Sequence, residues 1–188
     1  VWDLTLQLYD VEGVQSACLQ LQDELGVGVS ALLTVMILGF SGEPPFTAPV
    51  MKQALKRATD WQQTVIEPLR AVRRGLREAS PADQSEAVEA LRKALLSQEI
   101  AAEKIQQALI CQDAPESTWP CQSRSDCMIN AHTNALMYLA CIGKAGNKKA
   151  AEPLLQRLVE ALAKIHPIWM PPPGAPPPPI PPPMPPPA

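Results

Sequence analysis

Residues 61–111 read WQQTVIEPLRAVRRGLREASPADQSEAVEALRKALLSQEIAAEKIQQALIC, and this stretch decides the fold. Two runs of helix-forming residues are separated by a single Ser-Pro pair, and each run carries an apolar stripe with helical spacing. The first stripe comprises Trp61, Val65, Leu69, Val72 and Leu76, and the second comprises Val88, Leu91, Leu95, Ala102, Ile105 and Leu109. Because the link between the runs is short, the pattern predicts an antiparallel helical hairpin.

Residues that favour helix starts flank both halves of this hairpin. Thr47 is placed to cap a helix over about 48–79, and Ser80, followed by proline, is placed to cap a second helix over 81–111. Pro68 lies inside the first helix and removes one of its backbone hydrogen bonds, so we expect a kink there.

Shorter helical patterns lie on both sides of the hairpin. Gly26 is placed to end one of them in a left-handed turn, Ser30 to cap the next, and Pro153 to limit the start of the last. A loop is expected over 112–124, with two prolines. The expected helices cover residues 2–10, 14–25, 31–39, 126–142 and about 148–166.

These patterns predict an all-α protein: one bundle of about six to seven helices over residues 1–166, followed by a tail over 167–188. Aromatic residues make up only 4% of the chain, so aliphatic side chains must build the core. The longest apolar run, residues 31–40, is half the roughly 20 residues that span a bilayer. It therefore predicts a central buried helix, and no membrane span is expected.

Charge is unevenly distributed around a formal net charge of -3. Residues 1–47 contain six acids and no Lys or Arg, whereas residues 48–79 contain seven bases and three acids. This pattern favours internal pairing, and nucleic-acid binding is not expected without a basic surplus. Within it, a ladder of ion pairs is predicted between the hairpin helices, at the edge of their seam. A phosphate or other anion site is the alternative. The candidate residues are Arg70, Arg73, Arg74, Arg77, Glu99 and Glu103.

Proline dominates the C-terminus: 13 of the 22 prolines lie within 171–188. Such a segment favours a polyproline II helix, which aromatic-lined grooves recognise because it is already ordered. No Lys or Arg flanks it, so a profilin-like or WW-like groove fits better than an SH3 groove. A spacer without a partner is the alternative. The candidate partner-binding residues are Trp169, Pro176, Pro177, Pro178, Pro179, Ile180, Pro181, Pro182, Pro183 and Met184. Trp2, Tyr9 and Trp119 are aromatic candidates for receiving the segment within the same chain.

Five cysteines without a recognisable secretory signal favour a reducing compartment, and a cytoplasmic location is expected. Cys18 and Cys141 lie in apolar helical patterns and are expected in the core. Cys111, Cys121 and Cys127 have poor zinc spacing, so unbonded loop cysteines are favoured over a disulfide or a metal site. No catalytic motif occurs, and we expect no catalytic residue, cofactor or metal.

Several short strings resemble one family. They include Trp2-Asp-Leu near the start, the string from Pro68 through Leu69-Arg70 to Arg73-Arg74-Gly75-Leu76 in the middle, and the later pair Tyr138-Leu139. The chain is similar over about residues 1–162 to an uncharacterised group of small helical proteobacterial proteins, a domain of unknown function. The resemblance implies a cytoplasmic bacterial protein and no particular activity, and the proline tail lies outside it.

The sequence therefore favours an interaction protein, a helical domain that presents or receives a polyproline II segment in the same chain or in another. The alternative is a helical enzyme or a domain that binds a small ligand or phosphate through the Arg70–Arg77 and Glu99–Glu103 region. Trp61 is expected to be largely buried against the N-terminal helices.

Overall fold

The computed structural model describes residues 1–78, 85–115 and 123–165. Within those ranges all regular structure is helical, and α4, η1 and α5 form one continuous rod, so seven helical rods are present. The α-helices are α1 Trp2–Tyr9, α2 Val14–Leu25, α3 Val29–Phe40, α4 Ala48–Trp61, α5 Glu67–Glu78, α6 Ser85–Cys111, α7 Arg124–Cys141 and α8 Lys148–Ile165. A π-helical turn, η1 (Gln62–Ile66), joins α4 to α5, and a 3-10 turn, η3 (Ala145–Asn147), precedes α8. The all-α prediction is confirmed.

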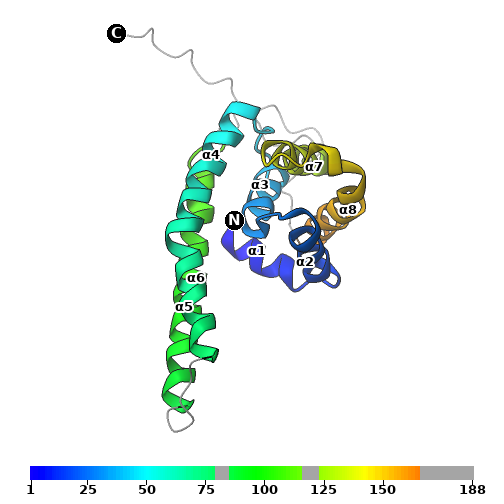
Figure 1. Ribbon diagram of the computed structural model, residues 1–188. Coiled ribbons are helices and arrows are strands. Elements are labelled where there is room, and N and C mark those ends of the chain that lie inside the picture. The colour runs from blue at the N-terminus through cyan, green and yellow to red at the C-terminus, as the bar shows by residue number, and fades with distance from the viewer. Residues whose placement is uncertain (79–84, 116–122, 166–188) are drawn as a thin grey trace, which may run out of the picture.

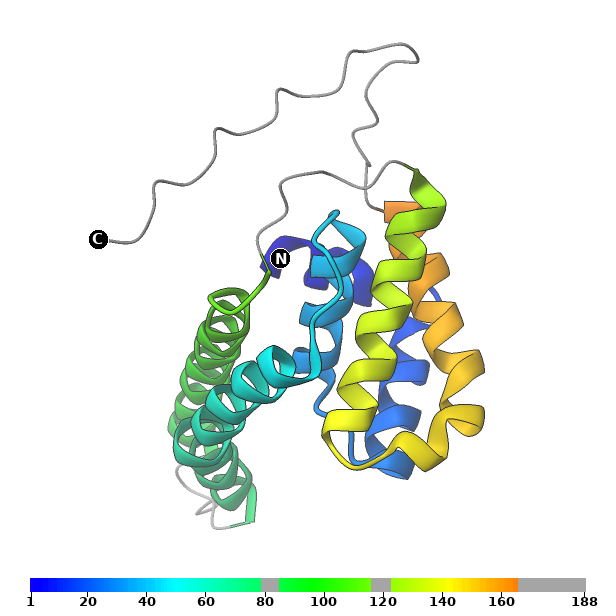
Figure 2. The same ribbon diagram turned by 90° about the horizontal axis from the view of Figure 1, so that it is seen from above.

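The rods form two parts (Figure 1). The rod of α4, η1 and α5 pairs with the antiparallel α6 to form the predicted hairpin, which stands beside a bundle of α1, α2, α3, α7 and α8. Figure 2 shows the bundle on one side of the hairpin only. No helix in the described ranges is long and apolar enough to cross a membrane.

The apolar run at residues 31–40 forms the centre of the bundle, because every residue in it is buried. α3 packs most extensively against α7, and a Cβ at Gly39 would lie only 2.8 Å from the Asn130 backbone. Asn134, fully buried on α7, accepts a hydrogen bond from the Phe46 N–H (2.8 Å) and donates one to the Val35 carbonyl (2.9 Å). The predicted central helix is thus confirmed, and a buried amide fixes its position.

Two predicted helix starts are wrong. α3 begins at Val29 after Gly28, so Ser30 lies in its first turn and is not its cap. The Gly28 N–H is instead bonded to the Tyr138 hydroxyl at 2.9 Å. Pro153 lies inside α8, which starts five residues earlier, so it does not limit that helix. Ser80 lies outside the described residues.

Pro68 neither ends nor breaks its helix. The backbone N–H of Glu67 bonds to the Gln62 carbonyl five residues earlier, which widens the turn just before the proline. Such π-helical turns relieve the clash between a proline ring and the carbonyl of the preceding turn. The rod therefore continues through Pro68 to Glu78.

The seam of the hairpin is rotated from the predicted stripe. The buried residues of α6 include Glu99, Gln106 and Gln107, whereas Leu91 is 49% exposed and Ile105 is 47% exposed. Val72, predicted in the facing stripe, is 55% exposed, and α5 contains no buried residue. These three stripe residues were therefore assigned to the wrong face, because polar contacts of α6 turn it toward the bundle.

Candidate binding groove

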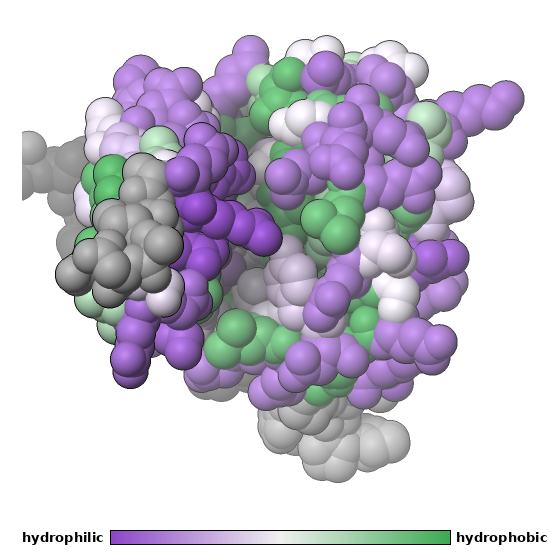
Figure 3. All heavy atoms as spheres, turned by 60° about the horizontal axis from the view of Figure 1, so that its bottom comes forward, coloured by the Kyte–Doolittle hydropathy of each residue, from purple (hydrophilic) through white to green (hydrophobic). Residues whose placement is uncertain are grey.

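An open groove of about 600 Å³ lies between the hairpin and the bundle. Figure 3 shows this hollow, with hydrophilic side chains along the hairpin side. α1 and the turn between α2 and α3 form the bundle wall, whereas α4, η1, α5 and α6 form the hairpin wall. The groove is therefore formed by helices from distant parts of the chain.

Buried polar side chains tie the two walls together. Gln107 of α6 donates from Nε2 to the Thr5 hydroxyl of α1 at 3.1 Å, and both residues are buried. The buried Gln106 donates to the Ala58 carbonyl and to Gln62 Oε1, each at 3.0 Å. Because buried polar groups must be bonded, these contacts fix α1 and η1 relative to α6.

Tyr9 and Cys18 form one corner of the bundle beside the groove. Burial, and then the neighbouring Cys18 and Glu103, raise the pKa of the Tyr9 phenol well above its usual value, although Arg70 acts in the opposite direction. Burial raises the pKa of the Cys18 thiol to about 11, against a smaller opposing effect of its hydrogen bond with Tyr9. Both groups therefore stay protonated near neutral pH, where Tyr9 can donate a hydrogen bond and Cys18 is no thiolate nucleophile.

Aromatic and aliphatic surfaces line the rest of the groove. Trp2 and Tyr9 of α1 are half-buried there, and Leu6 and Ile100 are exposed at 49% and 45%. Trp61 is also half-buried, but its indole N–H is bonded to the Ala102 carbonyl of α6 at 2.9 Å. Trp61 is thus partly buried, and the hydrogen bond that fixes its indole lies within the hairpin and not, as had been expected, against the N-terminal helices.

The predicted ladder is present on the groove side of the hairpin. Arg73 meets Glu99 through two bonds, Nε to Oε1 at 2.5 Å and Nη2 to Oε2 at 3.2 Å. Arg70 is paired with Glu103, and its Nε lies 3.7 Å from Glu99. Glu99 is only 3% exposed, so it lies inside the seam and not at the expected edge.

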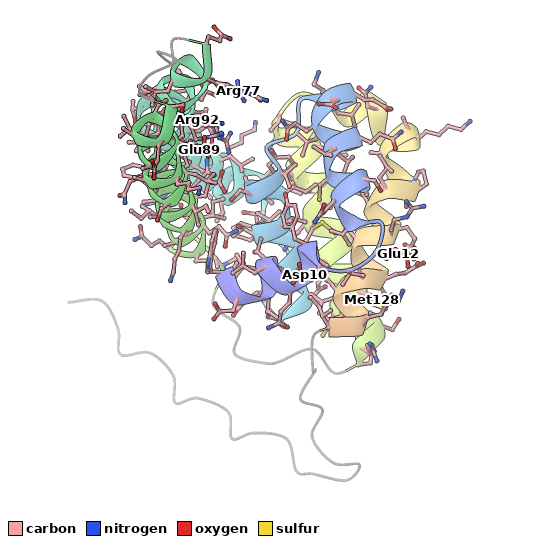
Figure 4. All side chains as sticks on the ribbon, turned by 90° about the horizontal axis from the view of Figure 1, so that it is seen from below. Asp10, Glu12, Arg77, Glu89, Arg92 and Met128 are labelled. Atoms are coloured by element: carbon pink, nitrogen blue, oxygen red, sulfur yellow. The ribbon has the colours of Figure 1, made fainter. Side chains whose placement is uncertain are left out.

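Arg74 and Arg77 do not join this ladder. Both are exposed, and neither forms an ion pair with a described residue. Figure 4 shows Arg77 extending from α5 toward the space between the hairpin and the bundle, while Arg92 and Glu89 lie together on α6 at 2.6 Å. The structure thus brings together four of the six predicted residues.

The cysteines and histidines show no assembled metal centre in the described ranges, where no suitable group of three ligands occurs. Cys18 is buried as predicted, whereas Cys141 is half-buried. Burial raises the pKa of the Cys111 and Cys141 thiols as well. His132 Nε2 lies 2.9 Å from Glu152 Oε1 on α8.

Several predicted positions fall outside the described residues. These are Trp119, Cys121 and the whole candidate tail from Trp169 through Pro176 to Met184. The docking of the tail therefore stays a prediction.

Sequence reasoning missed Thr5, Gln106 and Gln107. Each is a polar residue beside an apolar stripe, and a polar residue at such a position is normally expected to face solvent. The sequence signal of these buried polar contacts is weak: Gln106 and Gln107 are adjacent and follow Glu103, which borders the predicted stripe, by about one helical turn.

Comparison with protein families finds a match over the first part of the chain. The family model described as a protein of unknown function, DUF2390, matches residues 1–110. This range extends from α1 into the last turn of α6 and contains most of the groove; it stops short of the resemblance expected to about residue 162. No curated protein and no solved structure matches the chain.

Proposed function

Since this chain belongs to the DUF2390 family of proteins of unknown function, we propose from its own geometry that it is a non-enzymatic interaction protein whose groove receives a polyproline II segment. The observation that carries this proposal is the pairing of Trp2 and Tyr9 on one wall of an open groove of about 600 Å³. Proline-rich helices bind between aromatic faces, and their carbonyls accept bonds from Trp and Tyr donors.

The chemistry of the groove matches such a ligand. The Tyr9 phenol keeps its proton, which it could donate to a ligand carbonyl in place of its contact with Cys18. Arg70 is the one Lys or Arg among the described residues that line the groove, and it is already paired with Glu103, so the lining offers little free positive charge to an anion. A neutral, apolar rod with exposed carbonyls therefore fits the groove better than an anion does.

The occupant that we propose is the proline-rich segment 171–187 of the same chain. α8, which leads into it, packs against α1, the helix that carries Trp2 and Tyr9. In polyproline II form its 17 residues would extend about 50 Å. The whole domain is about 40 Å across, by the usual scaling of size with chain length, so the segment is long enough to reach the groove.

The test is a labelled peptide of residues 176–188 titrated into two full-length proteins. One is the wild type, and the other is a serine-tail variant in which Pro176–Pro179 and Pro181–Pro183 are replaced by Ser. We expect the peptide to bind the serine-tail variant and to bind the wild type more weakly, because the chain's own segment competes. Equal binding would contradict occupation by the same chain, and no binding would contradict the proposal as a whole.

A matched pair of substitutions in the serine-tail variant places the peptide. Trp2→Ala removes an aromatic face from the groove and should abolish binding. Ile129→Ala removes an exposed side chain of α7 (58% exposed), outside the groove lining, and should leave binding unchanged.

A small anion is the second candidate ligand, and Arg77 is the residue that favours it. Its exposed guanidinium extends toward the space beside the groove without an ion pair to a described residue (Figure 4). Binding of inorganic phosphate that weakens steeply with salt and disappears in Arg77→Ala would support this alternative.

A further inference from the structure

The hairpin presents an apolar face on the side opposite the ladder, and no described element covers it (Figures 1 and 2). Its large residues are Val72, Leu91 and Ile105, which are 55%, 49% and 47% exposed. Leu91 and Ile105 are 14 residues apart, close to four helical turns, so they lie on one face of α6. Val72 lies on the same side of the hairpin, because it is about 160° around α5 from Arg70, which lines the groove.

Small side chains fill the rest of this face. Four exposed alanines of α6 recur at seven-residue spacing, at positions 87, 94, 101 and 108; the middle two lie between Leu91 and Ile105, and the outer two lie beyond them. At 100° per residue, the 120° arc that contains them holds no Asp, Glu, Lys or Arg of this described helix. A face with large residues set among small ones, and without charge, suits close packing of another helix.

Gly75 adds an independent observation. It lies in the interior of α5 on the same side as Val72, and a Cβ placed there would meet nothing within 4 Å. Glycine in a helix interior costs about 1 kcal/mol relative to alanine, and no contact within the described chain requires it. A closely approaching helix from outside would require it.

We propose that this face, which we call the outer face, is a two-fold interface with a second copy of this chain. In an antiparallel pair of identical helices, α6 would face α6 of the partner, and the heptad of alanines would match itself about a point between Ser97 and Gln98. Ala94 would then face Ala101 of the partner subunit, and Leu91 would pack near Ile105 of the partner subunit. The two hairpins together would form a four-helix bundle.

The size of the outer face fits this occupant. From residue 87 to 108 the face is about 30 Å long, and two helices side by side are about 20 Å wide. It would thus cover about 600 Å² on each copy, and residues at its rim would bring it near the roughly 800 Å² per partner of a standard interface. The absence of charge from the α6 arc of this face also argues against a strongly charged partner.

The first experiment measures the mass of the full-length protein by sedimentation over a wide concentration range. The chain has a mass of 20.4 kDa, and we expect twice that value for the wild type. Leu91→Glu should halve the mass, because it buries a charge against an apolar partner. Leu19→Glu is the matched control: Leu19 is 57% exposed on α2, away from the outer face, and its variant should stay dimeric. A monomeric wild type, or a variant Leu91→Glu that stays dimeric, overturns the proposal.

A second experiment does not depend on how the charged variant folds. Gln98 lies next to the proposed axis. Mild oxidation should therefore link two chains of the Gln98→Cys variant by a disulfide, to a greater extent than it links wild-type chains through their native cysteines. Ala87→Cys and Ala108→Cys should not link alone, because their sites would be about 30 Å apart across the axis, but a mixture of the two should. Linking of each alone and not of the mixture would indicate parallel helices and overturn the antiparallel arrangement.

Discussion

Arg73 and Glu99 form a two-bond ion pair across the hairpin, and Glu99 is almost fully buried within it at 3% exposure. Among the described residues, truncating the arginine leaves this buried carboxylate with Arg70 as its remaining ion-pair partner, whose Nε lies 3.7 Å from Glu99 Oε2. We therefore expect Arg73→Met to lower the free energy of unfolding by about 3 kcal/mol, as for other buried pairs that lose one partner.

The control for that prediction is Arg74→Met in the same helix. Arg74 is exposed, so its replacement should change the free energy of unfolding by less than about 0.5 kcal/mol. Urea denaturation measures both values, and equal losses for the two variants would show that the ladder does not stabilise the hairpin.

The position of α3 should depend on Asn134. Its side-chain amide accepts from the Phe46 N–H and donates to the Val35 carbonyl, so Asn134→Ala leaves one buried N–H without a partner and removes the second bond of a carbonyl that keeps its helical bond in α3. We expect a loss of about 2 kcal/mol in the free energy of unfolding, because a buried group left without a partner costs about 1–3 kcal/mol. Asn147→Ala, at an exposed position of η3, is the control, and a similar thermal midpoint for both variants would contradict the role of the amide.

The contact between Thr5 and Gln107 should couple the bundle to the hairpin energetically. A double-mutant cycle with Thr5→Val and Gln107→Leu should give a coupling energy of about 1 kcal/mol, because the pair is buried. The exposed pair Gln20 and Glu24, within α2, should give less than about 0.5 kcal/mol in the same cycle. A coupling energy no larger than that of the exposed pair would contradict the idea that this contact couples the bundle to the hairpin.

Stability should fall at alkaline pH. Burial raises the pKa of both tyrosines, Tyr9 and Tyr138, and raises the pKa of Cys18 to about 11 from 9.0. For a group whose folded pKa is raised, its stabilising contribution is complete below the unfolded pKa and is lost as the pH rises above it. The loss should therefore begin near pH 9 with the thiol and steepen above pH 10 with the phenols. The ultraviolet absorbance of phenolate should appear only as the protein unfolds, and phenolate formation in the folded protein near pH 10 would contradict the burial of both rings.

The features that could be predicted from the sequence are those that depend on residues close together along the chain. The run at 31–40 became the central helix because its uninterrupted apolar surface can only be buried, and the hairpin formed because its two long stripes are adjacent. The pairing of Arg70 and Arg73 with Glu99 and Glu103 followed from facing positions on those stripes.

The groove could not be predicted, because its contacts join distant parts of the chain. Thr5 and Gln107 are 102 residues apart, and the sequence around one residue does not indicate that the other is its hydrogen-bond partner. The same contacts turn α6 toward the bundle, which is why Leu91 and Ile105 lie outside the predicted seam. Pro68 was expected to kink the helix by removing one backbone hydrogen bond; the π-helical turn that precedes it leaves no periodic signal in the sequence.

The proposed docking of the proline segment is tested most directly by the side-chain N–H resonance of Trp2 in the full-length protein. Its nuclear magnetic resonance position, assigned with Trp2→Phe, is compared between the wild type and the serine-tail variant, in which Pro176–Pro179 and Pro181–Pro183 are replaced by Ser. If the segment occupies the groove, the Trp2 resonance should shift in the variant. The resonance of Trp61, whose N–H is bonded to the Ala102 carbonyl, should stay in place. A Trp2 resonance that is unchanged by loss of the prolines would contradict the proposal that the segment lies in the groove.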